Sequence, residues 1–124
     1  MSYPTTCDRL DGRRVLVTGA SRGLGAEIAC LLASAGAELM ISGRDASGVA
    51  STQQLVQQHG RHCHVITADL RSVDETLQLA DWALELFGTV DILVNNAGVV
   101  FVEDLLGATL EHWEHTQSVN LRAP

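Results

Sequence analysis

Three glycines spaced as Gly-x3-Gly-x-Gly, namely Gly19, Gly23 and Gly25, separate a short apolar run from a helical pattern. Glycine allows backbone dihedrals that are closed to other residues and lets the main chain approach a ligand closely. The free amides and the dipole at the start of a helix favour a bound anion such as a pyrophosphate. The turn therefore predicts a dinucleotide-phosphate site, although a tight turn that binds nothing would give the same pattern.

Four short apolar runs alternate with helical patterns along the chain and supply the elements that would position this turn. Strands are predicted over residues 14–19, 38–42, 62–67 and 91–95, and helices over 23–35, 46–59, 72–88 and from about 109 to the end. Strands that alternate with helices form right-handed βαβ crossovers. The predicted fold class is therefore α/β, a Rossmann-like doubly wound parallel sheet, in one domain.

The spacing of apolar residues also predicts which face of two helices is buried. The first helix is expected to bury Leu24, Ile28, Leu31, Leu32 and Ala35, and the third to bury Val73, Leu77, Ala80, Leu84 and Phe87. Ser72 and Glu75 have the spacing of a capping box, in which each side chain accepts from the other residue's backbone amide.

Composition excludes several classes of function. The chain has 124 residues with 8 basic and 15 acidic side chains, a formal charge of −7, and every basic residue is an arginine. An acidic chain without a basic cluster is a poor partner for nucleic acid or an anionic membrane. No apolar stretch is long enough for a membrane span and no secretion signal is visible, so we expect a cytoplasmic protein. The widely spaced Cys7, Cys30 and Cys63 suit reduced thiols, and Cys30 is expected to be a core residue.

Two motifs together carry a family resemblance. The segment from Thr18 to Gly25, joined to Asn95-Asn96-Ala97-Gly98 after the fourth predicted strand, resembles the short-chain dehydrogenase/reductase (SDR) family. The resemblance covers the chain from about Leu10 onward. It implies that residues 1–124 are an NAD(P)-binding Rossmann domain, the amino-terminal half of an SDR domain, truncated after the fourth strand and the following helix. It further implies cofactor contacts from Gly19, Ser21, Arg22, Gly23, Leu24, Gly25, Arg44, Asp69, Leu70, Asn96, Ala97 and Gly98.

The resemblance also bears on the choice between NADP and NAD. The family carboxylate that holds the ribose of NAD would stand at Gly43, where this chain has no acid, whereas Arg44 follows and Arg22 lies in the glycine turn. Two guanidinium groups suit a 2′-phosphate, so NADP is expected and NAD is less favoured. The alternative is that Arg44 is a solvated turn residue and that Asp45 caps the next helix.

Other positions match the family's adenine and ribose contacts. Asp69 stands where a carboxylate accepts from the adenine amino group, and Leu70 where a side chain packs on the ring; the alternative for Asp69 is a loop acid near a helix start. Asn96 and Gly98 are the expected ribose-side contacts. Asn95 is instead open to a structural role, as a buried amide that ties neighbouring strands together.

The catalytic residues are only partly present. Asn120, in Ser118-Val-Asn-Leu121, matches the family Asn whose backbone carbonyl holds a water in the proton relay. The Ser and the Tyr-x3-Lys that complete this tetrad have no counterpart, because the chain has no lysine and its one tyrosine is Tyr3. The resemblance thus implies the cofactor-binding half of an NADP(H)-dependent oxidoreductase of the carbonyl reductase or alcohol dehydrogenase type, inactive as this chain alone.

The family resemblance also implies partners for the protein, and two other functions stand as alternatives to it. The resemblance implies a small carbonyl or alcohol substrate and a homo-oligomer at full length, with the last helix exposing Leu110, Trp113 and Gln117. In the family order 3-2-1-4-5-6-7 the fourth strand is interior, so here it would be an open edge. The alternatives are a non-catalytic dinucleotide-binding module and a Rossmann-like fold without nucleotide. His112 and His115, three residues apart, have no acidic partner fixed by pattern, so no metal site is expected.

Overall fold

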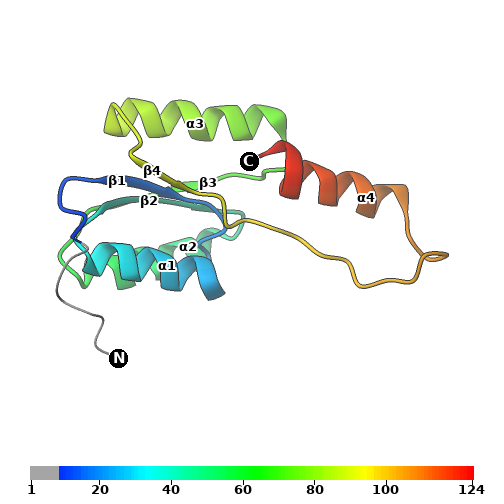
Figure 1. The fold of residues 1–124 in the computed structure, drawn as a ribbon, viewed down its shortest axis with the longest axis horizontal. Helices are drawn as coiled ribbons and strands as arrows, with labels where there is room; N and C mark the ends of the chain where they lie inside the picture. The colour runs from blue at the N-terminus through cyan, green and yellow to red at the C-terminus, as the bar shows by residue number, and fades with distance from the viewer. Residues whose placement is uncertain (1–8) are drawn as a thin grey trace.

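The computed structural model describes residues 9–124, so the expectations for Tyr3 and Cys7 lie outside the described residues. Strands and helices alternate in the order predicted (Figure 1). The elements are β1 (Arg14–Val17), α1 (Gly23–Ser34), β2 (Glu38–Gly43), α2 (Ala46–Gln57), β3 (Cys63–Thr67), α3 (Val73–Phe87), β4 (Ile92–Val94), α4 (Leu110–Gln117) and a π-helical turn, η1 (Ser118–Arg122). Among the described residues, no helix has the length and apolar run needed to cross a membrane.

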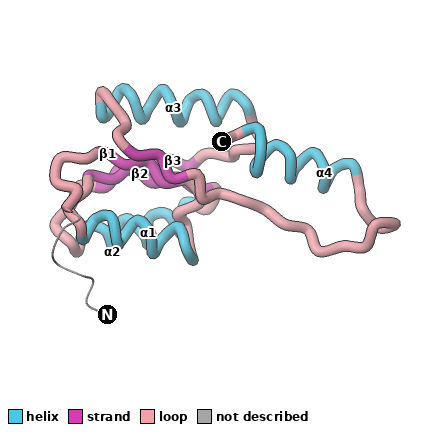
Figure 2. The backbone as a smooth tube through the Cα atoms, viewed as in Figure 1, coloured by secondary structure: helices cyan, strands magenta, loops and turns pink. Residues whose placement is uncertain are grey.

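The four strands form one parallel sheet in the order β3-β2-β1-β4. Register places Val17 opposite Ile41 on one side and Val94 on the other, so three strands end close together at their carboxyl ends. Helices α1 and α2 cover one face of the sheet and α3 covers the other (Figures 1 and 2). The doubly wound α/β fold predicted from the sequence is therefore confirmed.

Two apolar clusters hold these layers together. Val15, Val17, Leu39 and Ile41 are fully buried against α1 and α2, whereas Leu16 and Met40 belong to the cluster under α3. Alternate residues of β1 and β2 thus face opposite layers, which explains why each strand carries three consecutive apolar residues, Val15–Val17 in β1 and Leu39–Ile41 in β2. Cys30 is half-buried rather than a full core residue. Cys63 is buried, and its burial raises the pKa of the thiol to about 12.

Several predicted strands and helices were one or two residues too long at an end. The first strand ends at Val17 and not at Gly19, because Gly19 turns the chain with a φ of 66°. The strand predicted over 91–95 contains only Ile92–Val94, the one over 62–67 begins at Cys63, and the helix over 46–59 ends at Gln57. Each error falls at an element end and amounts to one or two residues, where element boundaries are least well defined by sequence pattern.

The predicted buried faces of two helices were wrong in part. In α1 the buried residues are Gly25, Ala29 and Ala33, and in α3 they are Leu79, Ala83 and Phe87. Phe87 is buried as predicted, and Ile28, Leu32 and Ala35 are half-buried. The other expected core residues are exposed, namely Leu24, Leu31, Val73, Leu77, Ala80 and Leu84. The small side chains on α1 let that helix approach the sheet, and α3 carries apolar residues on more than one face.

Only one of the two hydrogen bonds of the predicted capping box forms at the start of α3. The Ser72 side chain accepts from the Glu75 amide at 3.2 Å, as predicted. The Glu75 carboxylate, however, accepts from the backbone amide of Asp69 at 2.7 Å, and the Ser72 amide donates to the Asp69 carbonyl. The turn between β3 and α3 thus presents a closer donor to Glu75 than the one predicted.

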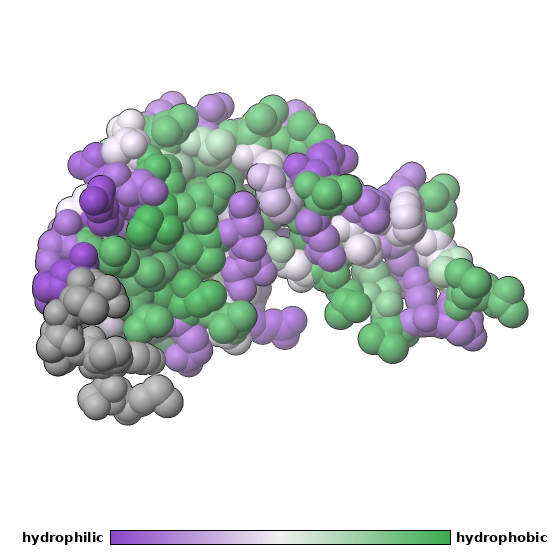
Figure 3. Space-filling model, viewed as in Figure 1, coloured by the Kyte–Doolittle hydropathy of each residue, from purple (hydrophilic) through white to green (hydrophobic). Residues whose placement is uncertain are grey.

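Strand β4 lies at the edge of the sheet, paired only with β1 among the described strands. Leu93 is 51% exposed, and Ile92 and Val94 are half-buried. Figure 3 shows apolar side chains gathered over this edge, between α1 and α3. The expected open apolar edge is present. Leu110 and Trp113 of α4 are exposed as predicted, whereas Gln117 is half-buried.

Candidate functional site

The glycine turn leaves the start of α1 without a cap. Gly19 and Gly23 have φ angles of 66° and 57°, a region that favours glycine. Arg22 occupies the N-cap position and its side chain makes no capping hydrogen bond, whereas α2, α3 and α4 are each capped by a side chain. The first amides of α1 therefore remain for another acceptor, and the positive end of the helix dipole favours an anion there.

Asn96 holds this turn in place. Its Nδ2 donates to the carbonyl oxygens of Thr18 and Gly19, each at 3.0 Å. The Ala97 amide donates to the Thr18 hydroxyl at 3.2 Å, so the segment after β4 is bonded to the segment after β1. The amide tie considered for Asn95 is made instead by Asn96, whereas Asn95 is exposed.

Gly25 is required by close packing and not by its dihedrals. A Cβ at this position would collide with the Gly19 carbonyl oxygen and the Asn96 amide nitrogen. A Cβ at Gly19 would itself lie 2.7 Å from the Ala97 Cα. The third glycine thus lets α1 approach the turn, while the first also admits the segment after β4.

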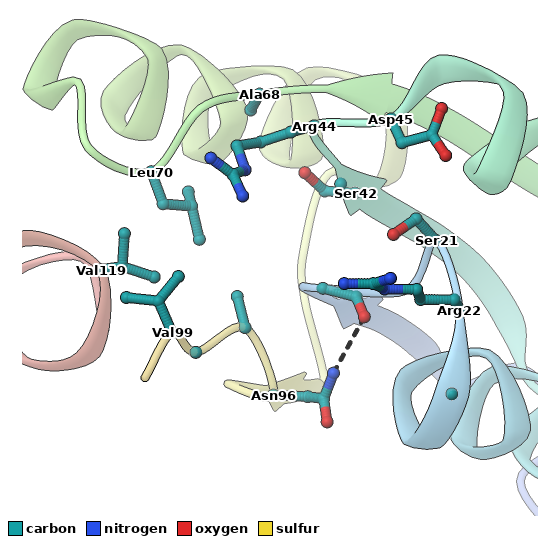
Figure 4. A pocket seen from close by; sticks show the side chains of 15 residues that line it. Ser21, Arg22, Ser42, Arg44, Asp45, Ala68, Leu70, Asn96, Val99 and Val119 are labelled. Atoms are coloured by element: carbon teal, nitrogen blue, oxygen red, sulfur yellow. Dashed lines mark hydrogen bonds between the residues drawn. The ribbon is translucent and has the colours of Figure 1, made fainter. Parts of the chain in front are cut away.

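A pocket of about 550 Å³ opens at the carboxyl ends of β1, β2 and β4 (Figure 4). Nine of the predicted cofactor residues line it: Gly19, Ser21, Arg22, Gly23, Arg44, Leu70, Asn96, Ala97 and Gly98. The remaining lining residues are Ser42, Gly43, Asp45, Ala68, Val99 and Val119. The turn, the end of β2 and the Asn-Asn-Ala-Gly segment are therefore brought together, as the motif spacing predicted.

Four predicted site residues do not line this pocket. Leu24 is 70% exposed on the surface of α1, and Gly25 is buried behind the turn. Asp69 lines a neighbouring hollow, and Asn120 lies beside the pocket, where its side chain binds the backbone of Val99. Gly25 and Asn120 thus support lining residues, whereas the structure gives Leu24 no contact with the pocket.

The basic and acidic side chains at the pocket point in different directions. In Figure 4 the guanidinium groups of Arg22 and Arg44 point into the pocket, whereas the Asp45 carboxylate points away. Asp45 accepts from the backbone amide of Ser47 at 3.1 Å and from its hydroxyl at 2.9 Å, which holds the pKa of Asp45 below its usual value. Asp45 therefore caps α2, as the alternative predicted, yet Arg44 also faces the pocket.

Gly43 is closely packed at the position where the family acid would stand. A Cβ there would lie 2.9 Å from Cγ1 of Val49 and 3.2 Å from Cβ of Ser21. A side chain at this position would therefore require Val49 or Ser21 to shift. The pocket consequently presents two arginines and, at the end of β2, no carboxylate.

Asp69 is paired with Arg71 in the neighbouring hollow. The Arg71 Nη2 lies 2.5 Å from one carboxylate oxygen of Asp69, and the Arg71 Nε lies 2.9 Å from the same oxygen. These hydrogen bonds hold the pKa of Asp69 below its usual value. The hollow shares Arg44, Asp45 and Ala68 with the larger pocket.

The histidine cluster of α4 differs from the prediction in one respect. His112 has an acidic partner, since its Nδ1 lies 2.7 Å from the Glu103 carboxylate, and Phe101 stacks on the His112 ring at 4.0 Å. Glu103 lies in the loop before α4, too irregular a segment for spacing to reveal the pair. In the part of the chain that the structure describes, no group of three His, Cys, Asp or Glu residues could hold a metal ion.

Sequence reasoning missed the apolar wall of the pocket. Val99 and Val119 face Leu70 across it in Figure 4. The sequence could have identified them by their position beside motif residues, because Val99 follows Gly98 directly and Val119 precedes Asn120. A residue next to a motif residue shares its location, although its side-chain direction is set only by the fold.

The family described as short chain dehydrogenase matches residues 13–124 of this chain. Among curated relatives, 2-dehydro-3-deoxy-D-gluconate 5-dehydrogenase from Bacillus subtilis is 39% identical over 125 residues, which cover 99% of this chain and 48% of that protein. The chain spans less than half the length of this relative.

Solved structures of short-chain dehydrogenases and oxidoreductases also match this chain. A short chain dehydrogenase from Burkholderia cenocepacia, in complex with NADP, has 40% identity and a TM-score of 0.88 over 93% of this chain and 47% of its own. A metagenomic short-chain oxidoreductase in complex with NADP has 36% identity and a TM-score of 0.88, over 93% of this chain and 52% of its own. The arrangement described above is therefore shared with proteins about twice as long.

Proposed function

The chain belongs to the short-chain dehydrogenase/reductase family, and we propose that it is the NADP(H)-binding part of an oxidoreductase. The proposed substrate of the whole protein is a small carbonyl compound or alcohol. Two of its structural neighbours are complexes with NADP, which supports the choice of cofactor. The chain has no lysine, so the family's Tyr-x3-Lys would have to lie outside these residues.

The observation that carries this proposal is the charge of the pocket. Arg22 and Arg44 point into it, and β2 ends at Gly43 without a carboxylate. Guanidinium groups bind phosphate oxygens in a bidentate geometry, whereas a carboxylate at the end of β2 would accept from an unmodified ribose and repel a phosphate. The pocket therefore favours a dinucleotide with a 2′-phosphate.

The glycine turn and the apolar wall complete the site. The uncapped amides at the start of α1 would hold the pyrophosphate, and Ala68 and Leu70 would flank the adenine end. Gly98, Val99 and Val119 would line the wall that faces Leu70. Bound NADPH would supply a hydride for a carbonyl carbon, and the residues of the turn and the wall would orient the cofactor.

Asn120 fits the role that the family resemblance implies. It lies in η1, and the residue four positions later is Pro124, which has no N–H. The Asn120 carbonyl oxygen therefore receives no α-helical hydrogen bond from the residue four positions later, which is compatible with acceptance from a water molecule. Its side chain is occupied by Val99, so the backbone carbonyl is the group we assign to a proton relay.

The proposal is tested by titrating an Arg44→Met variant with NADPH and with NADH, following nicotinamide fluorescence. Loss of a phosphate-binding arginine should weaken NADPH binding about tenfold and leave NADH binding within about twofold. Arg61→Met is the matched control, because Arg61 pairs with Asp11 and does not line the pocket. Equal losses for both dinucleotides would contradict a 2′-phosphate contact.

A further inference from the structure

Arg71 encloses the carboxylate of Asp69. Its Nη2 donates to Oδ2 at 2.5 Å, its Nε lies 2.9 Å from Oδ2 and 3.1 Å from Oδ1, and its backbone amide donates to Oδ1 at 2.9 Å. Both carboxylate oxygens are thus bonded to one residue. The Asp69 side chain is 24% exposed and the Arg71 side chain 51%, so the pair still faces the hollow.

The backbone beneath this pair is also held. The Asp69 amide donates to the Glu75 carboxylate at 2.7 Å, and the Asp69 carbonyl accepts from the Ser72 amide at 2.9 Å. Arg122, from η1, donates to the Arg71 carbonyl at 2.5 Å. Neither the main chain nor the side chain of Asp69 can therefore turn without breaking several hydrogen bonds.

The hollow lies next to the proposed 2′-phosphate position. It shares Arg44, Asp45 and Ala68 with the larger pocket. A ribose whose 2′-phosphate meets Arg22 and Arg44 would direct its base toward Ala68 and Asp69. An ionised carboxylate only accepts hydrogen bonds, so it favours a 6-amino purine, which donates, over a 6-oxo purine, which presents an oxygen.

We propose that Arg71 is a positioning residue that fixes Asp69 as a hydrogen-bond acceptor, so that the pocket selects a 6-amino purine dinucleotide over its 6-oxo counterpart. This inference rests on the proposed NADP(H) function and adds to it a residue that selects the base. Without Arg71 the carboxylate would rotate and hydrate, and its discrimination between the two bases would fall.

The test compares NADPH with the reduced nicotinamide hypoxanthine dinucleotide phosphate, whose base carries a 6-oxo group and a protonated N1 in place of the 6-amino group and the unprotonated N1. Both are titrated by nicotinamide fluorescence into the unaltered chain, Arg71→Met, Arg71→Lys and the control Arg61→Met. Because the readout is a ratio of two dissociation constants, a general loss of stability or affinity does not change it.

The unaltered chain and Arg61→Met should prefer NADPH about tenfold, the range of a hydrogen bond to a charged group. Arg71→Met should reduce this ratio to within about twofold, and Arg71→Lys should restore part of it because a cation returns beside Asp69. The preference of Arg71→Met for NADPH over NADH should persist, since Arg22 and Arg44 are unchanged.

Two results would overturn the inference in distinguishable ways. If Arg71→Met kept the full preference for the 6-amino base, Arg71 would have no positioning role, and the NADP(H) site would stand. If the unaltered chain bound neither dinucleotide, the proposed cofactor site would fail and the inference with it.

Discussion

Asn120 holds the backbone of Val99 through two hydrogen bonds, although the two residues are 21 positions apart. Its Nδ2 donates to the Val99 carbonyl at 2.8 Å, and its Oδ1 accepts from the Val99 amide at 2.9 Å. One side chain thus satisfies both backbone groups of a residue that lines the pocket. The contact links η1 to the segment after β4 and fixes the wall of the pocket.

Replacement of Asn120 by alanine should release this wall. Each lost hydrogen bond is worth about 0.5–1.5 kcal/mol, so the Val99 amide should exchange with solvent about tenfold faster. Hydrogen exchange followed by nuclear magnetic resonance measures this directly. Gln117→Ala, one helical turn earlier, is the control, and equal protection of the Val99 amide in both variants would contradict the clamp.

Gly25→Ala should destabilise the fold and impair dinucleotide binding together. Its Cβ would collide with the Gly19 carbonyl and the Asn96 amide, and overpacking of this kind costs about 1–3 kcal/mol. Gly98→Ala is the matched variant, because a Cβ there would lie 3.6 Å from the Asn120 Oδ1, an ordinary contact. Urea unfolding of the two variants should separate them, and a Gly25→Ala chain as stable as the unaltered one would refute the packing role.

The Asp69–Arg71 pair should make stability depend on pH. Because the pKa of Asp69 is lowered in the folded chain, its contribution is complete above the ordinary aspartate pKa of about 3.9 and is lost as the pH falls through the lowered value. The difference in urea midpoint between the unaltered chain and Asp69→Asn should therefore be largest at neutral pH. It should narrow as the pH falls through the lowered pKa of Asp69, and a difference that grows on acidification would have the wrong sign.

The open edge at β4 predicts self-association of this chain. Unpaired backbone groups on an apolar edge strand are available to a second chain, and Leu93 is half exposed there. Size-exclusion chromatography should show concentration-dependent multimers. Leu93→Lys should shift the profile toward monomer, and a concentration-independent monomer for the unaltered chain would show that the edge does not associate.

The sequence predicted the order of the elements and the location of the pocket because both depend on short-range features. The glycine turn follows a buried strand directly, and the Asn-Asn-Ala-Gly segment follows another, so their strands bring them together. The arginines could be placed for the same reason, since Arg44 follows the end of β2.

The sequence did not determine the buried faces of the helices or the directions of individual side chains, because these depend on which side of each element faces the sheet. Helix α3 carries apolar residues around much of its circumference, so periodicity selected Leu77 and Leu84 although Leu79 and Ala83 are buried. The structural tie considered for Asn95 is likewise made by Asn96, which also lines the pocket as predicted, because adjacent residues after a strand point in opposite directions. The Asp69–Arg71 pair required knowledge of two side-chain rotamers.

The most direct test of the central claim is titration of the unaltered chain with NADPH and, separately, with NADH, followed by nicotinamide fluorescence. Tighter binding of NADPH, by about tenfold, is the result that Arg22 and Arg44 predict. Equal affinity for both, or tighter binding of NADH, would contradict the assignment of this pocket to a 2′-phosphorylated dinucleotide.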